Sequence, residues 1–179
     1  MDERLINLAP TPSNLIEPGH TEAWPDIEAE FGTGLPTDFK EIIDRYGVGR
    51  FGNYIYLFNP FGSNQPTYKQ WAGDLLQDYL THQTKWPDLT ASFSAFPEPG
   101  GLLPWGYTKN ASWLLWKTVG EPDQWPLVLL DADLTKWASE YEMTISTFLS
   151  EWLLENVIVE FFPDDLEVMA EGGFRPGRN

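Results

Sequence analysis

Four short runs typical of β-strands follow one another in the second half of the chain, separated only by short turns. They cover residues 103–108, 112–119, 124–131 and 136–141. A short turn can join antiparallel neighbours, whereas parallel neighbours need a crossover of about a dozen residues or more. This region therefore predicts an antiparallel meander, which limits the folds open to the rest of the chain.

Apolar residues recur at helical spacing on both sides of this meander. Helices are predicted over residues 24–31, over 36–46 (opening at Leu35-Pro36), over 66–84 and over 144–153, with a further strand over 53–58. The apolar stripes consist of Trp24, Ile27 and Phe31; Phe39, Ile42, Ile43 and Tyr46; Tyr68, Trp71, Leu75 and Tyr79, with Leu76 as a further candidate; and Ile145, Phe148, Leu149, Trp152 and Leu153. Helices before and after a contiguous antiparallel sheet predict an α+β fold.

The 179 residues suffice for a single domain with its own core, which we place at residues 21–162. Residues 1–20 contain three prolines and no period, so we expect an extended N-terminal arm that packs weakly or frays. Residues 163–179 are expected to be a C-terminal tail that frays at its end, with an acidic cluster at Asp164, Asp165 and Glu167.

The chain is strongly acidic. Eleven basic and 27 acidic residues give a formal net charge of −16. Such a surface repels nucleic acid and anionic lipid, and it suits a basic partner or simply keeps the protein in solution. The absence of cysteine excludes disulfides and thiolate chemistry. With no signal-peptide pattern and no run approaching about 20 apolar residues, a cytoplasmic location is expected, without membrane, metal or cofactor.

The segment 47–52, GVGRFG, matches the spacing of a dinucleotide-binding loop. That function requires a strand before the glycines and a helix after them, so that phosphate meets a helix N-terminus. Here the predicted order is reversed, and phosphate would meet a helix C-terminus. We therefore interpret Gly47, Gly49 and Gly52 as turn residues with positive φ.

Other candidates for chemistry are weak. Asp131-Ala132-Asp133 could offer two carboxylates to a cation, but it falls where the meander should turn, and a turn is the favoured interpretation. His20 and His82 have no nucleophile motif beside them. The sequence leaves open whether two of the many carboxylates form a catalytic pair. No pair stands out, so no enzyme is expected.

Five of the nine tryptophans lie in or beside the predicted meander. They could present an aromatic platform to a sugar or a peptide. Large aromatic residues more often fill a core, and we favour core packing for most of them. Glu28 lies beside the apolar stripe of the first predicted helix, where its carboxylate is expected to accept hydrogen bonds from backbone N–H groups of a neighbouring loop.

An ordered set of residues resembles the SUKH superfamily, which includes the yeast Smi/Knr cell-wall-assembly regulator. The resemblance spans residues 21–155, and the motif residues, expected to be mainly structural, are Trp24, Ile27, Glu28, Gly32, Leu35, Pro36, Phe39, Tyr46, Gly47, Trp105, Gly106, Trp116 and Trp125. Bacterial members are similar to immunity proteins that bind a toxin.

The resemblance implies a non-enzymatic protein that covers the active site of a cognate toxin. A basic nuclease is the toxin that the acidic balance suits. The acidic residues predicted to contact it are Asp38, Glu41 and Asp44, on the outer face of the second helix, and Asp131 and Asp133. The alternative is an intracellular scaffold or a module that binds a peptide or glycan in a groove of the Trp-rich sheet. Salt-sensitive binding would favour the toxin, and salt-insensitive binding the alternative.

Overall fold

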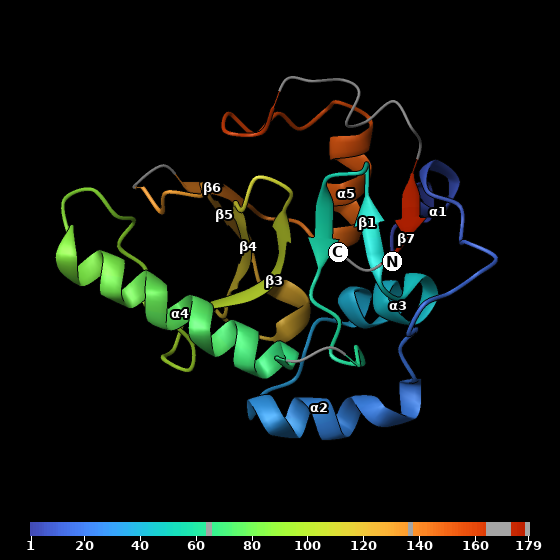
Figure 1. Ribbon diagram of the computed structural model, residues 1–179, viewed down its shortest axis with the longest axis horizontal. Coiled ribbons are helices and arrows are strands. Elements are labelled where there is room, and N and C mark those ends of the chain that lie inside the picture. Colours follow the sequence, from blue (N-terminus) through green and yellow to red (C-terminus); the bar gives the residue numbers. More distant parts are fainter. Residues whose placement is uncertain (64–65, 136–137, 164–172, 178–179) are drawn as a thin grey trace.

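The computed structural model describes residues 1–63, 66–135, 138–163 and 173–177 (Figure 1). Its helices are α1 (Glu3–Leu8), α2 (Trp24–Phe31), α3 (Thr37–Tyr46), α4 (Tyr68–Lys85) and α5 (Ile145–Leu153), with short 3₁₀ turns at Thr21–Ala23 and Pro122–Gln124. Its strands are β1 (Gly49–Phe51), β2 (Ile55–Leu57), β3 (Leu102–Thr108), β4 (Trp113–Lys117), β5 (Leu127–Leu130), β6 (Ala138–Tyr141) and β7 (Phe174–Pro176).

These strands form one sheet in the order β6-β5-β4-β3-β2-β1-β7, and all neighbours are antiparallel. The predicted meander is β3 to β6. The β1–β2 hairpin extends it past β3, and β7 returns from the far end of the chain to pair with β1 (Figure 1). The predicted α+β fold is confirmed, with β1 and β7 as strands that the sequence patterns did not indicate.

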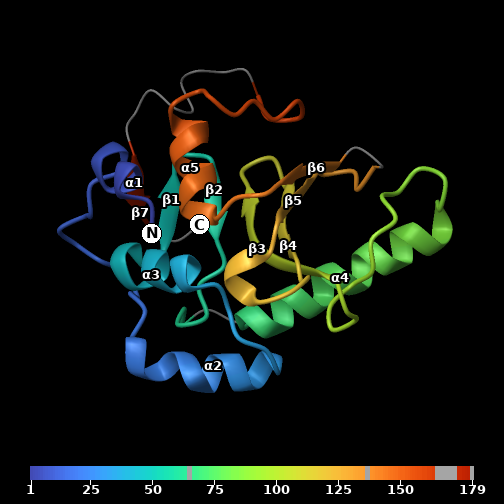
Figure 2. The ribbon, with the colours of Figure 1, turned by 180° about the vertical axis from the view of Figure 1, so that it is seen from behind.

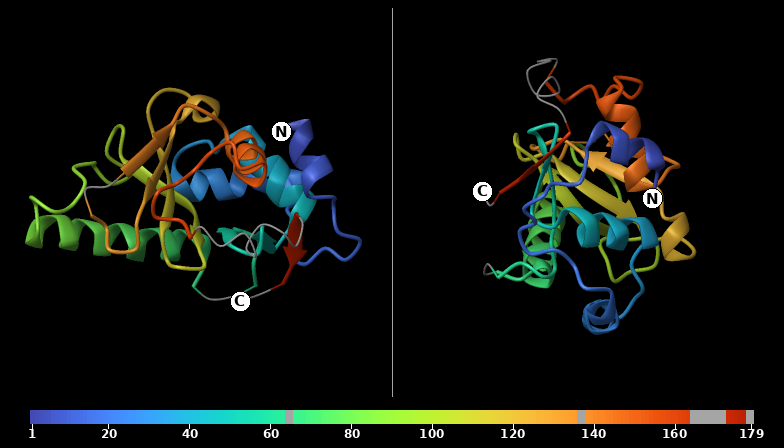
Figure 3. Two further views of the ribbon diagram at one scale, coloured as in Figure 1. Left: turned by 90° about the horizontal axis from the view of Figure 1, so that it is seen from above. Right: turned by 90° about the vertical axis from the view of Figure 1, so that its right-hand side faces the viewer.

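Helices cover the sheet from both sides. Figures 2 and 3 show α1, α3 and α5 on one side and α4 on the other. Against the first group pack the buried side chains of Leu103, Trp105, Leu114, Trp116, Leu127 and Leu129. On the α4 side lie Leu102, Leu115, Val128 and Leu130, in one cluster with Leu76 and Tyr79 of α4. Alternating residues of β4 and β5 thus face opposite layers, as the pleat requires.

The tryptophans of the meander mostly fill this core. Trp105, Trp116 and Trp125 are 0%, 1% and 6% exposed. Trp116 lies between the other two, with ring centroids 6.5 Å from Trp105 and 6.0 Å from Trp125. Core packing is therefore confirmed for these three, and they offer no platform on the surface. Trp137 lies outside the described residues.

The expectation of a weakly packed N-terminal arm is wrong. Residues 3–8 form α1, and Leu5 is fully buried. The Tyr46 hydroxyl donates a hydrogen bond to the Ala9 carbonyl oxygen at 2.7 Å, and Val48 N–H donates to the Ile16 carbonyl oxygen at 2.7 Å. Residues 1–20 contain three prolines and show no apolar periodicity, but tertiary contacts hold this segment in place.

The C-terminal end also differs from the expectation, because Phe174–Pro176 form β7 instead of a frayed tail. The acidic cluster Asp164, Asp165 and Glu167 lies outside the described residues. In the GVGRFG segment, Gly47 and Gly52 have φ of +64° and +54°, as turn glycines should. Gly49 instead lies within β1, where a Cβ atom would come within 2.4 Å of the Arg175 carbonyl oxygen of β7.

Candidate functional site

Helix α4 covers only part of its face of the sheet, and four cross-strand neighbours on the same face lie beside it. Tyr107 of β3 stands opposite Tyr56 of β2. Tyr56 stands opposite Arg50 of β1, which in turn stands opposite Arg175 of β7. All four side chains are only partly buried. Directly paired residues share one face of a sheet, so this register builds a continuous row across the strands.

Aromatic rings continue the row toward α4. The rings of Tyr56 and Tyr107 are stacked, with centroids 5.1 Å apart and planes 9° apart. Phe58 lies 5.4 Å from Tyr107 and 6.3 Å from Trp71 of α4. At the opposite end, the Arg50 guanidinium lies 6.0 Å from the centroid of Tyr56. We call Tyr56, Tyr107, Phe58 and Trp71 the aromatic row.

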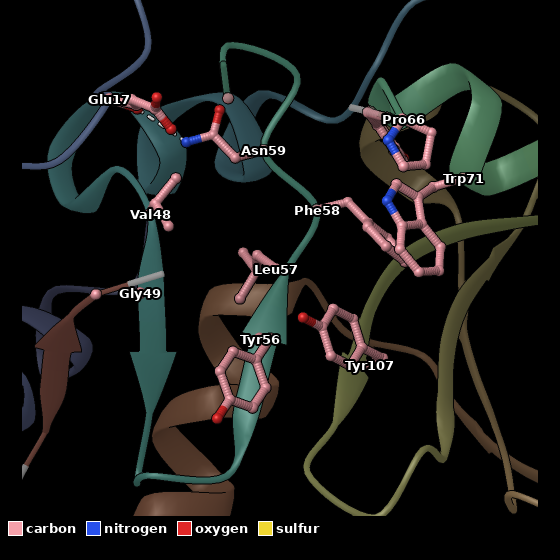
Figure 4. Close-up of a pocket in the computed structure, with 13 residues that line it drawn as sticks. Glu17, Val48, Gly49, Tyr56, Leu57, Phe58, Asn59, Pro66, Trp71 and Tyr107 are labelled. Atoms are coloured by element: carbon pink, nitrogen blue, oxygen red, sulfur yellow. Dashed lines mark hydrogen bonds between the residues drawn. The ribbon is translucent and has the colours of Figure 1, made fainter. Parts of the chain in front are cut away.

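The aromatic row forms one wall of a groove of about 310 Å³ (Figure 4). Val48, Gly49, Glu17 and Asn59 lie on the other side, and Pro66 lies above Trp71. Trp71 is 46% exposed, a large value for an aromatic side chain. Concave sites with aromatic walls and a few polar groups are the usual form of binding sites.

The start of α4 holds Trp71 in place. Thr67 is the N-cap: it accepts a hydrogen bond from Gln70 N–H at 3.3 Å, and its own N–H donates to the Gln70 side chain at 2.8 Å. The Tyr68 hydroxyl then donates to the Pro104 carbonyl oxygen of β3 at 2.5 Å. Burial raises the pKa of Tyr68, so this hydroxyl stays protonated and able to donate. The helix therefore begins at a fixed point on the sheet, one turn before Trp71.

The opposite wall is held by side-chain bonds to the backbone. Asn59 Nδ2 donates to the Glu17 carbonyl oxygen at 2.8 Å, and Asn59 Oδ1 accepts from Phe61 N–H at 2.8 Å. The Glu17 carboxylate accepts from Ser63 N–H at 3.0 Å and from the Ser63 hydroxyl. A groove with both walls fixed in this way loses little conformational entropy when a ligand binds.

A family model of the SUKH group, described as SMI1-KNR4 cell-wall, matches residues 21–153, well over half of the chain. The chain belongs to the SUKH family. No curated protein and no solved structure matches it.

Most of the family-motif residues lie in the core of this SUKH chain. Buried among them are Trp24, Leu35, Pro36, Phe39, Tyr46, Gly47, Trp105, Gly106, Trp116 and Trp125. Ile27 packs against the core, and Gly32 ends α2 with φ of +73°. Glu28 Oε1 accepts from Leu35 N–H at 2.9 Å and from Lys40 Nζ at 2.7 Å, which confirms its predicted role in the neighbouring loop.

The acidic residues predicted on the outer face of the second helix do not share an open face. The prediction that Asp38 lies on the surface is wrong, because its side chain is only 8% exposed. It accepts a hydrogen bond from Ser146 N–H at 2.8 Å. Asp44 is partly buried and accepts from Trp24 Nε1 at 2.9 Å and from the Thr21 hydroxyl at 3.1 Å. The helical stripe located α3 correctly but could not show what its polar side touches.

Glu41 and the Asp131 turn have separate surroundings. Glu41 is exposed and forms an ion pair of 2.5 Å with the Met1 amino group. Asp131 accepts hydrogen bonds from Thr135 N–H and the Thr135 hydroxyl, both at 2.8 Å, as a turn residue does. Asp133 is exposed in the same turn. Glu41 and Asp133 keep exposed carboxylates, but they lie on α3 and on the β5–β6 turn respectively.

The aromatic row was missed because its members are far apart in the sequence. Tyr56 and Tyr107 become neighbours only through the β2–β3 pairing, which spans α4 and a long loop. The predicted stripe of α4 included Trp71, whereas its buried residues are Tyr68, Ala72, Leu76 and Tyr79. The helical spacing of Ala72, Leu76 and Tyr79 was the signal that would have placed Trp71 at the edge of the stripe.

In the part of the chain that the structure describes, no group of three His, Asp or Glu side chains could hold a metal ion. No described helix is both long and apolar enough to cross a membrane. Glu17 is the single carboxylate among the described residues that line the groove.

Proposed function

We propose that this SUKH chain is a non-enzymatic immunity protein, which binds a cognate toxin and covers its active site. The groove lined by the aromatic row, with Trp71 exposed at its edge, carries this proposal. Tyrosine and tryptophan side chains are enriched at the centres of protein interfaces, because they bury a large area with few rotatable bonds. The groove walls are fixed before binding, which suits a protein that acts by occupying a surface.

The charge of the chain supports a basic partner. With a formal net charge of −16, the protein attracts a basic surface at long range and orients it during the encounter. The groove of a nuclease is basic because it holds phosphate. A toxin of this class would therefore meet a complementary field, and the complex would weaken as salt rises.

The test is neutralisation with a defined stoichiometry. Proteins that bind the purified chain are isolated from the source cell, and a captured nuclease is assayed against DNA and RNA while the chain is titrated. We expect activity to fall to background at a fixed molar ratio, with the Kd rising as salt increases. A chain that binds no toxin and leaves nuclease activity unchanged, or that itself turns over a substrate, contradicts the proposal.

A binding module for peptides or glycans is the second candidate, and the aromatic groove also favours it. Its walls would be Tyr56, Tyr107 and Trp71 rather than the buried tryptophans of the meander. Binding to a neutral peptide or an oligosaccharide would depend on stacking and hydrogen bonds, so its Kd would change little with salt. Titration at two salt concentrations distinguishes the two candidates.

A further inference from the structure

The exposed face of α4 continues the groove with carboxylates. Asp74 and Asp78 follow Trp71 by three and seven residues, and all three side chains are exposed. Positions spaced in this way lie on one face of a helix. Trp71 thus stands where the aromatic row of the sheet meets an acidic stripe of the helix.

Asp74 and Asp78 differ from many other acidic residues of the protein. Asp2, Asp38 and Asp123 accept hydrogen bonds from backbone N–H groups, and Glu28 and Glu140 form ion pairs with lysines. For Asp74 and Asp78, no hydrogen bond or ion pair occurs within residues 1–63, 66–135, 138–163 and 173–177. Their carboxylates are therefore available to a ligand from outside the chain.

The two ends of the aromatic row have opposite charge. At the β1 end, Arg50 lies over Tyr56 and donates to Asn53 Oδ1 at 2.6 Å. At the α4 end, Asp74 and Asp78 follow the exposed Trp71. A cationic ligand is repelled from the first end and attracted to the second. Tryptophan is the aromatic residue that attracts cations best, and the adjacent carboxylates complement the same charge.

We infer that the surface at the α4 end of the groove, made of Trp71 in the groove wall and of Asp74 and Asp78 beyond it on the exposed face of α4, docks a basic segment of the partner protein through an arginine or lysine placed against the Trp71 indole. The inference rests on the proposed function and names the surface that carries it. The neighbouring tyrosines would cover the apolar stem of that side chain, which is how long basic residues pack on apolar surfaces. This surface replaces the predicted one on α3, where Asp38 and Asp44 bind groups of the chain itself.

The test uses two short peptides as probes, acetyl-Gly-Arg-Gly-Arg-Gly-amide and the same peptide with glutamate in place of arginine. Each is titrated into the ¹⁵N-labelled full chain at millimolar concentration, and the indole N–H signals are followed by NMR. Trp86 is the internal control, because it is 39% exposed at the other end of α4 and has the Lys85 ammonium 4.3 Å from its ring. We expect the arginine peptide to shift the Trp71 signal and leave Trp86 in place.

Two variants test the contributions separately. Trp71→Ala and the double change Asp74→Asn with Asp78→Asn should each weaken the binding of the arginine peptide by about three- to fivefold, the usual scale of an exposed cation–π contact or of an exposed charge pair. The matched control exchanges two acids elsewhere, Glu121→Gln with Glu155→Gln, and should leave binding unchanged. Equal shifts with both peptides, or equal losses in the control, overturn the inference.

Failure of the docking surface and failure of the proposed function give different results. If the arginine peptide binds at Trp71 but no nuclease is neutralised, the proposed function fails and the docking surface stands. If a nuclease is neutralised with the same Kd by wild type, by Trp71→Ala and by the double aspartate variant, the proposed function stands and this surface is wrong.

Discussion

The carboxylate of Asp38 on α3 accepts a hydrogen bond of 2.8 Å from the backbone N–H of Ser146, 108 residues later in the chain. Ser146 lies in the first turn of α5, whose N–H groups have no partner within the helix. Thr144 satisfies another of these donors as the N-cap, accepting from Thr147 N–H at 3.3 Å. Asp38 therefore caps α5 from a neighbouring helix and fixes how α3 and α5 pack.

Replacing Asp38 should lower stability and remove a pH dependence. Burial raises the pKa of Asp38 above its ordinary value of 3.8, although hydrogen bonds from Ser146 and Thr144 oppose this. Between the unfolded and the folded pKa, the native state binds more protons, so its stability falls as the pH rises through that window. We expect the stability of wild type relative to Asp38→Asn to fall as the pH increases above 3.8.

Urea unfolding of both proteins over a pH series measures this difference. The pKa of Asp2 and that of Glu151 are lowered by hydrogen bonds, chiefly from Arg4 and Asn156 respectively, but both groups are present in the two proteins and cancel in the comparison. Asp38→Ala, which leaves the Ser146 N–H without its acceptor, should cost about 1–3 kcal/mol at neutral pH. If the difference in unfolding free energy between wild type and Asp38→Asn does not change with pH, the raised pKa of Asp38 is contradicted.

Asp123 should contribute to stability although it is exposed. Its carboxylate accepts hydrogen bonds from Thr37 N–H at 2.5 Å and from the Thr37 hydroxyl at 3.0 Å, and so caps α3, whose N-cap residue is a proline. We expect Asp123→Ala to lower the free energy of unfolding by about 1 kcal/mol, a typical N-cap loss. Glu121→Ala, an exposed acid two residues away, is the control in the same urea experiment. An equal effect of the two changes would refute the cap.

Gly49→Ala should detach β7. A Cβ atom at this position would come within 2.3 Å of Phe174 Cζ and 2.4 Å of the Arg175 carbonyl oxygen. Crowding of this kind usually costs about 1–3 kcal/mol, and moving the three-residue edge strand is the simplest relief. Amide hydrogen exchange should therefore accelerate at Phe174, Arg175 and Gly177 and stay unchanged in β4 and β5. Unchanged exchange at Phe174, Arg175 and Gly177 would show that β7 does not pack against Gly49.

Gly73→Ala should instead stabilise the protein. Gly73 is exposed in the middle of α4, and a Cβ atom there would meet nothing within 4 Å. Alanine restricts the unfolded chain and favours the helix, so we expect a gain of about 0.5–1 kcal/mol in thermal or urea unfolding. A loss of stability would contradict the open space beside Gly73.

Much of the fold could be predicted from local patterns. The stripes of α2, α3 and α5 and the turns between β3 and β6 depend on residues close in sequence, and the predicted elements formed within a few residues of their expected ends. The α1 helix and strands β1 and β7 could not be predicted in this way. Each has three to six residues and forms only through contacts with distant partners. Asp2 N–H donates a hydrogen bond to the Ser146 hydroxyl, and Phe51 pairs with Phe174 across the sheet.

Less of the candidate site than of the fold could be predicted from the sequence. Composition indicated an acidic protein, but not which carboxylates face outward: Asp38 and Asp44 bind groups of the chain itself, while Asp74 and Asp78 have exposed side chains. Periodicity alone could not separate an exposed Trp71 from a buried one at the edge of the α4 stripe. The stacking of Tyr56 on Tyr107 required the register of two strands joined through a whole helix.

The sequence by itself determined the net charge, the absence of cysteine chemistry, the helical stripes and the antiparallel meander, because composition and short-range periodicity act through neighbouring residues. Only the tertiary structure decided which acids cap helices, which tryptophans are buried and where the groove opens. Those outcomes depend on contacts between residues 20 to more than 100 positions apart, such as Asp44 with Trp24 and Asp38 with Ser146. No local pattern records such contacts, because their energy is realised only when the elements have packed.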